Sequence, residues 1–399
     1  MQGSTGAERV HVVTSAEVGP ERLRVALDAT PLLGTPTGVG VFCQGALGAL
    51  GERADLDVRA FAVSWRRRGG ITATLPPGVT APQRPMPARP LHATWARRAW
   101  PPIELFIGRV DVVHGTNFVV PPTKRAAAVV SVHDLTPVHH PELCNKATLA
   151  YPGLIRGAVA RGAWVHTDSA FVAEEVIDAF GVPRERVRVV APGVPPLPAL
   201  APGTARSLVD PILPPGTTQY VLAIGTAEPR KDLPGLVRAF DLLADDHPDL
   251  SLVLAGPAGW GEDDLTTATE RARARARVVR TGWLAPTVLA ALLHQAAVLA
   301  YPSVYEGFGF PPLQAMAAGV PVVATRAGSL PEVLGDGALL VEVGDTDGLA
   351  QAVASVLDDP ALRQRLDAAG TVQAASFSWR RCGDELARLY RDMVGAAGG

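Results

Sequence analysis

The chain has 399 residues, of which 47% are hydrophobic and 19% charged, so it is long enough for two domains and too apolar for a disordered protein. Its formal net charge of −2 argues against a general binder of nucleic acid. It contains 40 glycines and 36 prolines without a repeat period, which excludes a collagen-like chain and indicates many tight turns.

The cysteines and the N-terminal residues favour a cytoplasmic protein. Cys43, Cys144 and Cys382 are odd in number and far apart, and they lack the spacing of a zinc site or a CxxC motif, so we expect reduced thiols. The N-terminal segment lacks the apolar core of a signal peptide. No apolar run approaches the ~18 residues that a membrane span requires. We therefore expect a cytoplasmic location, at most peripheral at the inner face of the membrane.

The first half of the chain alternates short apolar runs with helical patterns. We expect strands at residues 23–27, 58–63, 110–114, 129–132 and 187–190 and helices at 40–50, 147–159 and 171–180. The stretch 192–215 is dense in proline and poor in charge, which predicts a linker between two domains.

The second half shows the same alternation more clearly. We expect strands at 220–224, 252–255, 278–281, 298–301, 321–325 and 339–343 and helices at 233–244, 264–275, 286–296, 312–318 and 347–357. Such alternation predicts parallel sheets covered on both faces. An arginine-rich tail after residue 377 is expected to fold back over the domain joint. Ligands of open α/β sheets bind outside the carboxyl ends of strands, so we expect the site in the cleft between two doubly wound domains.

A glycine-containing loop, Glu306 to Phe310, follows the strand at 298–301. Pro311 and Pro312 open a helix there, and Gly319 is placed to end it. Free backbone N–H groups at such a helix start suit a phosphate. Glu306 would repel that phosphate, and is better suited to accept hydrogen bonds from sugar hydroxyls. The alternative is an ordinary turn with Glu306 facing solvent.

A basic pair follows the strand at 220–224 within GTAEPRKDL. Gly225 permits a tight turn, and Arg230 and Lys231 precede a helix that Asp232 can cap. Two cations beside a helix N-terminus form an anion site; the alternative is an exposed basic pair. Lys231 is one of three lysines, with Lys124 and Lys146, among 37 basic residues.

Two segments of the first half also follow strands. The segment Thr37-Gly38-Val39-Gly40 does not have the spacing GxGxxG, which argues against a nicotinamide dehydrogenase, but its backbone can line a diphosphate. His133 follows the strand at 129–132, and we expect it to face the cleft and donate to a sugar hydroxyl or a developing charge; a structural histidine is the alternative. His139 and His140 lack a carboxylate pair at metal-ligand spacing.

Two basic stretches carry less specific signals. On a helix, the arginines of 271–277 fall on opposite sides, which predicts a solvated helix end. Arg66–Arg68 and Trp95–Trp100 combine cations with aromatic rings, a composition that suits an anionic membrane surface.

Together these segments resemble the retaining glycosyltransferase family 4. The resemblance extends from about Asp28 to Tyr390 and rests on TGVG, HDL with a following HPE, GTAEPRKDL, VRTGW and PSVYEGFGFPPLQAMAAGVPVVAT, in that order. It implies the GT-B fold, in which two Rossmann-like doubly wound parallel-sheet domains face a central cleft. It further implies an acceptor-side domain at 22–200, a nucleotide-sugar-binding domain at 216–376 and a C-terminal helix at 377–396 that crosses back to the first domain.

The resemblance implies a metal-independent hexosyltransferase without a cofactor. Its donor would be a UDP-, GDP- or dTDP-sugar, its acceptor a glycan or lipid-linked hydroxyl, and its product a polysaccharide, O-antigen or glycolipid, with a mannosyl-like unit favoured. The family's catalytic positions match His133, Arg230, Lys231 and Glu306. Those for the donor sugar and diphosphate match Gly38, Gly40, Gly225, Phe308, Gly309 and Phe310, and those for the nucleoside match Gly282, Trp283 and Gln314.

One position departs from the family pattern. Gln314 stands where the family's E-x7-E motif has its second acidic residue, which usually accepts hydrogen bonds from the ribose. An uncharged amide makes weaker bonds there than a carboxylate, so ribose binding is expected to be weaker or differently arranged; a deoxyribose donor such as a dTDP-sugar is one interpretation. Gln314 also leaves open a catalytically silent sugar-nucleotide-binding scaffold of the same fold, although Glu306 and the basic pair argue against it.

Overall fold

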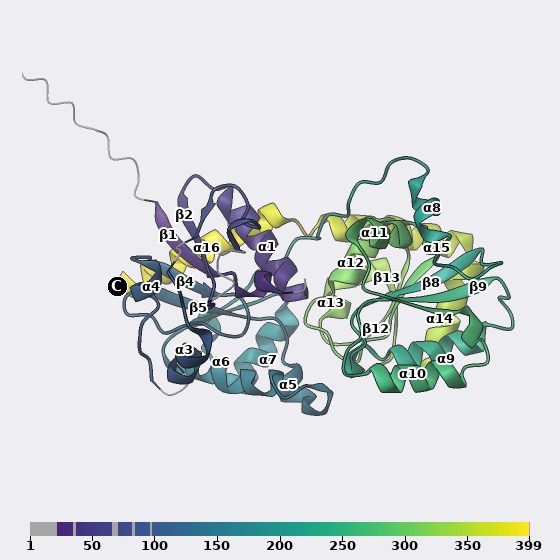
Figure 1. Cartoon of the computed structure of the whole chain (residues 1–399), viewed down its shortest axis with the longest axis horizontal. Coiled ribbons are helices and arrows are strands. Elements are labelled where there is room, and N and C mark those ends of the chain that lie inside the picture. The colour runs from purple at the N-terminus through teal and green to yellow at the C-terminus, as the bar shows by residue number, and fades with distance from the viewer. Residues whose placement is uncertain (1–21, 35–36, 66–70, 82–83, 96–97, 399) are drawn as a thin grey trace, which may run out of the picture.

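The chain folds into two α/β units, each built on a parallel sheet (Figure 1). The computed structural model describes residues 22–398 except 35–36, 66–70, 82–83 and 96–97. The first sheet has seven strands in the order β3-β2-β1-β4-β5-β6-β7, and the second has six in the order β10-β9-β8-β11-β12-β13. In both sheets the order reverses direction along the chain, as in doubly wound folds, so the expected fold class is confirmed.

The first unit contains the expected strands and two that the sequence pattern missed, β3 and β6. Its strands are β1 Leu23–Asp28, β2 Leu56–Phe61, β3 Val79–Thr80, β4 Val112–Gly115, β5 Ala127–Val132, β6 Trp164–Thr167 and β7 Val187–Val189. Its helices are α1 Gly38–Gly51, α3 Ala88–Trp95, α4 Glu104–Ile107, α5 Thr136–His139, α6 Tyr151–Ala160 and α7 Ala170–Phe180. The expected helix at 147–159 begins as a 3-10 turn, Thr148–Ala150, before α6.

The second unit follows the expected alternation closely. Its strands are β8 Gln219–Ile224, β9 Leu250–Ala255, β10 Val278–Gly282, β11 Val298–Tyr301, β12 Val322–Thr325 and β13 Ala338–Val341. Its helices are α9 Leu233–Leu243, α10 Glu262–Arg271, α11 Pro286–Gln295, α12 Phe310–Ala317, α13 Leu330–Leu334, α14 Thr346–Asp358 and α15 Pro360–Ala375. Helices α13 and α15 were not expected.

The proline-rich stretch is not a plain linker. It contains α8, Thr204–Val209, which packs against α11. Val209 is buried in the core that lies between α11, α12 and the second sheet. The apolar residues of the segment therefore extend the second unit's core, because burying them outweighs the helix-breaking effect of the neighbouring prolines.

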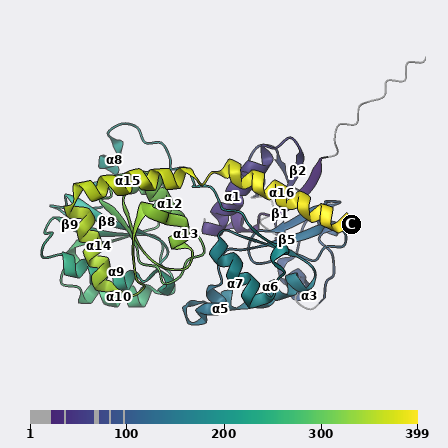
Figure 2. The same ribbon diagram turned by 180° about the vertical axis from the view of Figure 1, so that it is seen from behind.

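The last helix, α16 Trp379–Gly398, returns to the first unit and packs against α1 (Figure 2). Trp379 fits where two glycines leave room: a Cβ atom on Gly45 or Gly193 would lie 2.4 or 2.3 Å from its atoms. Further along, the buried Tyr390 hydroxyl lies 2.7 Å from Nδ1 of His114 on β4. The expected crossing of the C-terminal helix is therefore confirmed.

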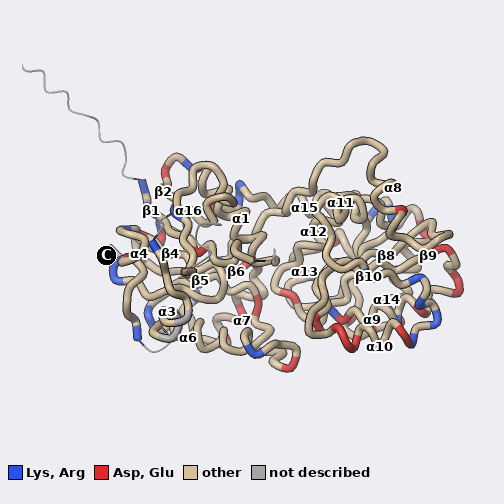
Figure 3. The backbone as a smooth tube through the Cα atoms, in the orientation of Figure 1, with Lys and Arg blue, Asp and Glu red and all other residues tan. Residues whose placement is uncertain are grey.

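Three of the four arginines of 271–277 are exposed at the end of a helix, as expected, but only Arg271 lies on that helix. Helix α10 ends at Arg271. Arg273 then pairs with Asp245 at 2.9 Å, and Arg277 donates to the carbonyls of Ala244 and His247 at 2.7 Å. These bonds satisfy free carbonyls at the end of α9, where cations are favourable. Figure 3 shows basic and acidic residues alternating around α9 and α10.

Within the described ranges, no helix is both long enough and apolar enough to span a bilayer. Cys43, Cys144 and Cys382 are all unpaired thiols. This agrees with the expected reduced state of the three cysteines.

Candidate functional site

The basic pair lies at the carboxyl end of β8. Arg230 and Lys231 occupy a 3-10 turn, Pro229–Lys231, directly before α9. Asp232 caps α9 as expected, with its side chain accepting from the Gly235 amide at 3.0 Å. Its φ of +41° is uncommon for a non-glycine residue, although aspartate is enriched there. This turn directs both basic side chains toward the neighbouring strand β11.

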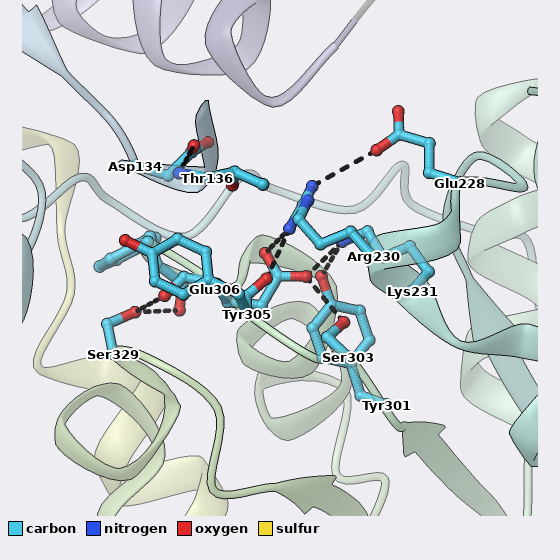
Figure 4. A network of polar contacts seen from close by, with 12 residues as sticks. Asp134, Thr136, Glu228, Arg230, Lys231, Tyr301, Ser303, Tyr305, Glu306 and Ser329 are labelled. Atoms are coloured by element: carbon cyan, nitrogen blue, oxygen red, sulfur yellow. Dashed lines mark hydrogen bonds and ion pairs between the residues drawn. The ribbon is translucent and has the colours of Figure 1, made fainter. Parts of the chain in front are cut away.

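Glu306 meets both cations (Figure 4). It follows β11, which pairs with β8, and it is 6% exposed. One carboxylate oxygen lies 2.6 Å from Lys231 Nζ and the other 2.8 Å from Arg230 Nη1. The Ser303 hydroxyl donates to it at 2.7 Å, and Lys231 also donates to the Tyr301 hydroxyl at 2.5 Å. Glu306 therefore does not face solvent.

The charges in this cluster shift one another's protonation. Burial by itself raises the pKa of Glu306, but Arg230 and Lys231 outweigh it and lower the pKa to about 2. Burial lowers the pKa of Lys231, with Glu306 acting in the opposite direction. Burial raises the pKa of Glu228, whose carboxylate lies 3.6 Å from Arg230. An anion that binds the cations must therefore compete with Glu306.

His133 follows β5 as expected, but its ring is held by protein groups. Nδ1 lies 2.7 Å from the Asp168 carboxylate, and Nε2 lies 2.8 Å from the Thr116 carbonyl. The ring packs edge-on against Phe42 and Phe118. Burial lowers its pKa, yet the Asp168 charge and hydrogen bond reverse this and raise the pKa of His133.

The loop of Glu306 touches the first unit directly. A Cβ atom on Gly307 would lie 1.7 Å from the His133 carbonyl oxygen, so only glycine fits there. The Ser169 hydroxyl donates to the Gly307 carbonyl at 2.9 Å. The loops that follow β5, β6 and β11 thus meet at one point, which brings the His133 backbone against the loop of Glu306.

Two further contacts join the units. The Tyr305 hydroxyl accepts from the Leu135 amide at 3.0 Å and donates to the Glu175 carboxylate. Glu332 on α13 accepts from the first two backbone amides of α7 at 2.8 and 2.9 Å. A carboxylate at a helix N-terminus is stabilising because it satisfies free N–H groups. One unit therefore caps a helix of the other.

The predicted glycines and phenylalanines lie around this junction. Gly38 and Gly40 form the first turn of α1, and a Cβ atom on Gly38 would lie 3.8 Å from the ring of Phe310. Phe308 is buried, with its ring 5.3 Å from that of Phe310, so only its backbone is available to a ligand. Gly309 is the N-cap residue of α12 and has a φ of +111°.

The remaining predicted residues lie at different distances from the cluster. Gly225 is beside the Lys231 side chain, at 3.5 Å from Cε for an added Cβ. Gln314 on α12 donates to the Pro195 carbonyl at 3.4 Å. Gly282 ends the edge strand β10, and Trp283 after it is 59% exposed. No contact of the described residues joins Trp283 to the Glu306 cluster.

The histidines after His133 lie beside carboxylates of the protein. His139 lies 3.2 Å from Glu175, and His140 lies 3.5 Å from Glu142. In the part of the chain that the structure describes, no three His, Cys, Asp or Glu side chains gather to hold a metal.

The aromatic and basic stretch is only partly available for a membrane. Trp95 is buried and donates from Nε1 to the Pro101 carbonyl at 2.9 Å, so its expected surface role is wrong. Trp65 and Trp100 are 56% and 64% exposed. Arg66–Arg68 lie outside the described residues.

Sequence reasoning missed Asp168, Glu332 and the tyrosines of this site. Asp168 follows β6, the strand that the sequence pattern did not predict. Tyr301 and Tyr305 flank the recognised loop and resemble core residues from sequence alone. Only the contact of Asp168 with His133 in the folded structure indicates a role for Asp168.

Two family models match the chain. The model described as "Glycosyl transferases group 1" matches residues 207–373, and that of "Glycosyltransferase Family 4" matches residues 36–196. Over 287 residues the chain is 32% identical to the O-antigen chain mannosyltransferase B of Escherichia coli, covering 70% of this chain and 74% of the relative. The chain belongs to glycosyltransferase family 4.

Other relatives and structures agree with this family. A glycogen synthase of Mycobacterium tuberculosis is 31% identical over 297 residues, which cover 71% of this chain and 69% of the relative. The solved sucrose-phosphate synthase of Thermosynechococcus elongatus superposes with a TM-score of 0.72 at 20% identity, covering 94% of this chain and all of that one. Anabaena HepE in complex with UDP and glucose has a TM-score of 0.70 at 20% identity, with 92% and 99% covered. These structures show that this glycosyltransferase has the GT-B fold.

Proposed function

We propose that this glycosyltransferase moves a hexosyl or deoxyhexosyl unit, with mannosyl favoured, from a nucleotide-diphosphate-sugar to a hydroxyl acceptor. The observation that carries the proposal is the buried cluster of Arg230, Lys231 and Glu306 at the carboxyl ends of β8 and β11. It offers two cations for a diphosphate and one carboxylate for sugar hydroxyls in a single place.

The leaving group determines the role of the cations. Breaking the anomeric C–O bond puts the bonding electrons on the diphosphate and leaves positive charge on the sugar. Arg230 and Lys231 stabilise the developing negative charge, in a buried place where such interactions are stronger than in water. When the diphosphate binds the two cations, Glu306 loses part of its contact with them. Hydrogen bonds from the sugar hydroxyls to the Glu306 carboxylate then replace that contact.

We propose retention of configuration without a covalent intermediate. The acceptor oxygen attacks the anomeric carbon on the face that the diphosphate leaves, and the hydroxyl proton passes to a departing phosphate oxygen. Bond formation, bond cleavage and proton transfer balance without a protein nucleophile. The cations perform the charge neutralisation that a metal ion performs elsewhere, so we propose that the enzyme needs no metal.

The acceptor and location are proposed from the relatives. The E. coli relative is named an O-antigen mannosyltransferase, and a solved neighbour, WaaG, is titled a glycosyltransferase involved in lipopolysaccharide biosynthesis. We propose a glycan or lipid-linked acceptor in polysaccharide, O-antigen or glycolipid synthesis. The exposed Trp65 and Trp100 would suit a peripheral contact with the inner face of the membrane.

The test is incubation with UDP-, GDP- and dTDP-sugars, including GDP-mannose, with the product's anomeric configuration read by NMR. Transfer or hydrolysis with retention is expected from at least one donor. Tight binding without either reaction would instead identify a silent sugar-nucleotide-binding protein. The same assay in excess chelator should keep its rate; loss that a divalent ion restores would overturn metal independence.

A further inference from the structure

We propose that Asp168 is a positioning residue that keeps a second proton on the His133 ring and fixes the direction of that ring. Among the described residues, no contact links Asp168 to the cation cluster; its polar contacts run through His133 and the neighbouring His166. The inference rests on the proposed function, in which Glu306 binds the donor sugar from the loop that touches the His133 backbone.

The pairing follows from the register of the first sheet. Strands β5 and β6 are adjacent and parallel, with Val132 opposite Thr167. The next residues, His133 and Asp168, therefore leave the sheet side by side at its carboxyl edge. Asp168 is only 4% exposed, and its Oδ2 lies 2.7 Å from Nδ1 of His133. A charged carboxylate this deeply buried is costly unless it is paired.

The partners of His133 determine how many protons the pair holds. Nε2 lies 2.8 Å from the Thr116 carbonyl oxygen, which can only accept, so Nε2 carries a hydrogen. A second proton lies between Nδ1 and the Asp168 carboxylate, because an ionised carboxylate also only accepts. The pair therefore holds two protons and is neutral as a whole, while the ring itself is a charged or nearly charged donor.

The two neighbouring histidines differ from His133 in this respect. The Tyr390 hydroxyl donates to His114 Nδ1, His114 Nε2 donates to Ser131, and Ser131 donates to His166 Nδ1. This chain of hydrogen bonds ends at His166, whose Nε2 donates to the Val190 carbonyl. Burial lowers the pKa of both His114 and His166, so both rings are neutral and each donates once and accepts once. Asp168 is the feature that makes His133 different.

Charged and titratable groups face His133 from several of the elements around it. Besides Asp168, Asp134 raises its pKa, and the rings of His114 and His166 on β4 and β6 lie near it as neutral groups. Phe42, Phe118 and Gly307 cover the rest of the ring and its backbone. A charged donor makes hydrogen bonds roughly twice as strong as a neutral one. Asp168 thus strengthens the bond from His133 Nε2 to the Thr116 carbonyl, and so holds in place the His133 backbone, whose carbonyl touches Gly307 in the Glu306 loop.

The variant Asp168→Asn separates charge from shape. An asparagine amide can donate from Nδ2 to His133 Nδ1, while Nε2 still donates to the Thr116 carbonyl. The ring then keeps its direction but holds one proton. We expect kcat at pH 8 to fall at least about tenfold with the donor KM changed less than about threefold. Activity should recover as the pH falls, because the ring then gains its second proton; the parent enzyme should show no such recovery.

A second measurement does not depend on activity. NMR titration of the His133 ring should show it protonated near neutral pH in the parent protein and neutral in Asp168→Asn. Asp111→Asn, which removes a half-buried ion pair to Arg24 in the same unit, is the matched control and should change neither readout. The proposal would be overturned if Asp168→Asn kept the pH profile of the parent enzyme, or if His133 were still protonated in that variant.

The test of Asp168 can be read even when the proposed function fails or the Asp168→Asn variant does not fold. If no donor is turned over, the proposed function fails while the NMR titration still decides the protonation of His133. If Asp168→Asn does not fold, Asp168→Glu replaces it, and a ring that stays protonated with a longer carboxylate supports the pairing. A neutral ring in Asp168→Glu or in the parent protein contradicts it.

Discussion

The ammonium of Lys231 and the carboxylate of Glu306 form a buried ion pair with an N–O distance of 2.6 Å. The same carboxylate pairs with Arg230 at 2.8 Å. The cations that would hold a diphosphate are therefore already neutralised in part by a residue that would hold the sugar. This relationship makes donor binding an exchange of partners, and it leads to the first two predictions.

Glu306→Gln should bind nucleoside diphosphates more tightly and transfer sugar more slowly. The amide no longer competes for the cations, so the Kd for UDP, GDP or dTDP should fall about tenfold or more, one charge-assisted contact being worth about 1.5–3 kcal/mol. Loss of the contact to the sugar should lower kcat by at least about a hundredfold. Isothermal titration calorimetry and the transfer assay measure the two effects. Glu228→Gln, which removes a longer contact of 3.6 Å to Arg230, is the control and should tighten binding much less.

Lys231→Ala should lose far more turnover than the removal of a surface charge. One lost charge-assisted contact to the leaving group costs about 1.5–3 kcal/mol, which corresponds to roughly 10- to 150-fold in rate. Steady-state kinetics with the preferred donor measure this loss. A change below about threefold would contradict a role at the diphosphate. Lys124→Ala, at an exposed position, is the matched control and should leave the rate unchanged.

Acid should destabilise the folded protein through Glu306. Its pKa lies at about 2 in the folded state against an ordinary 4.5. A lowered pKa contributes stability that is present above pH 4.5 and is lost as the pH falls towards 2. The loss is on the order of 3 kcal/mol, since one pKa unit corresponds to about 1.4 kcal/mol. Urea unfolding at a series of pH values should show a shallower decline for Glu306→Gln than for the parent; equal slopes would contradict the lowered pKa.

Gly45→Ala should weaken the docking of α16 onto α1. The added Cβ would lie 2.4 Å from Trp379, and such overpacking typically costs about 1–3 kcal/mol. Gly48 lies on the same helix with nothing within 4 Å of an added Cβ. Gly48→Ala should therefore gain up to about 1 kcal/mol from helix propensity. Thermal unfolding of the two variants measures the difference, and a stabilised Gly45→Ala would show that Trp379 does not occupy this place.

Gln314→Glu should retain activity, with a gain for donors that carry ribose. A carboxylate accepts stronger hydrogen bonds from ribose hydroxyls than an amide does, but it cannot donate to the Pro195 carbonyl as Gln314 does at 3.4 Å. Comparison of KM values for ribose and deoxyribose donors measures the effect. Complete inactivation would instead show that the neutral amide is required.

The local features of the site could be predicted from the sequence. Asp232 caps α9, Pro311 and Pro312 open α12, and Arg230, Lys231 and Glu306 follow strands β8 and β11. Caps, proline positions and the apolar strand runs depend on neighbours along the chain, so they are visible without a structure. The alternation of these strands with helices also determined the parallel sheets.

The partners of these residues were decided by the tertiary structure. The Asp168–His133 pair depends on the register of β5 and β6, and the fit of Trp379 between Gly45 and Gly193 joins segments that are distant along the chain. The Lys231–Glu306 pair likewise spans 75 residues. The sequence by itself determined which residues stand at the ends of strands and helices. Only the packing of sheets and helices decided which of them meet, because those contacts depend on distances through space rather than along the chain.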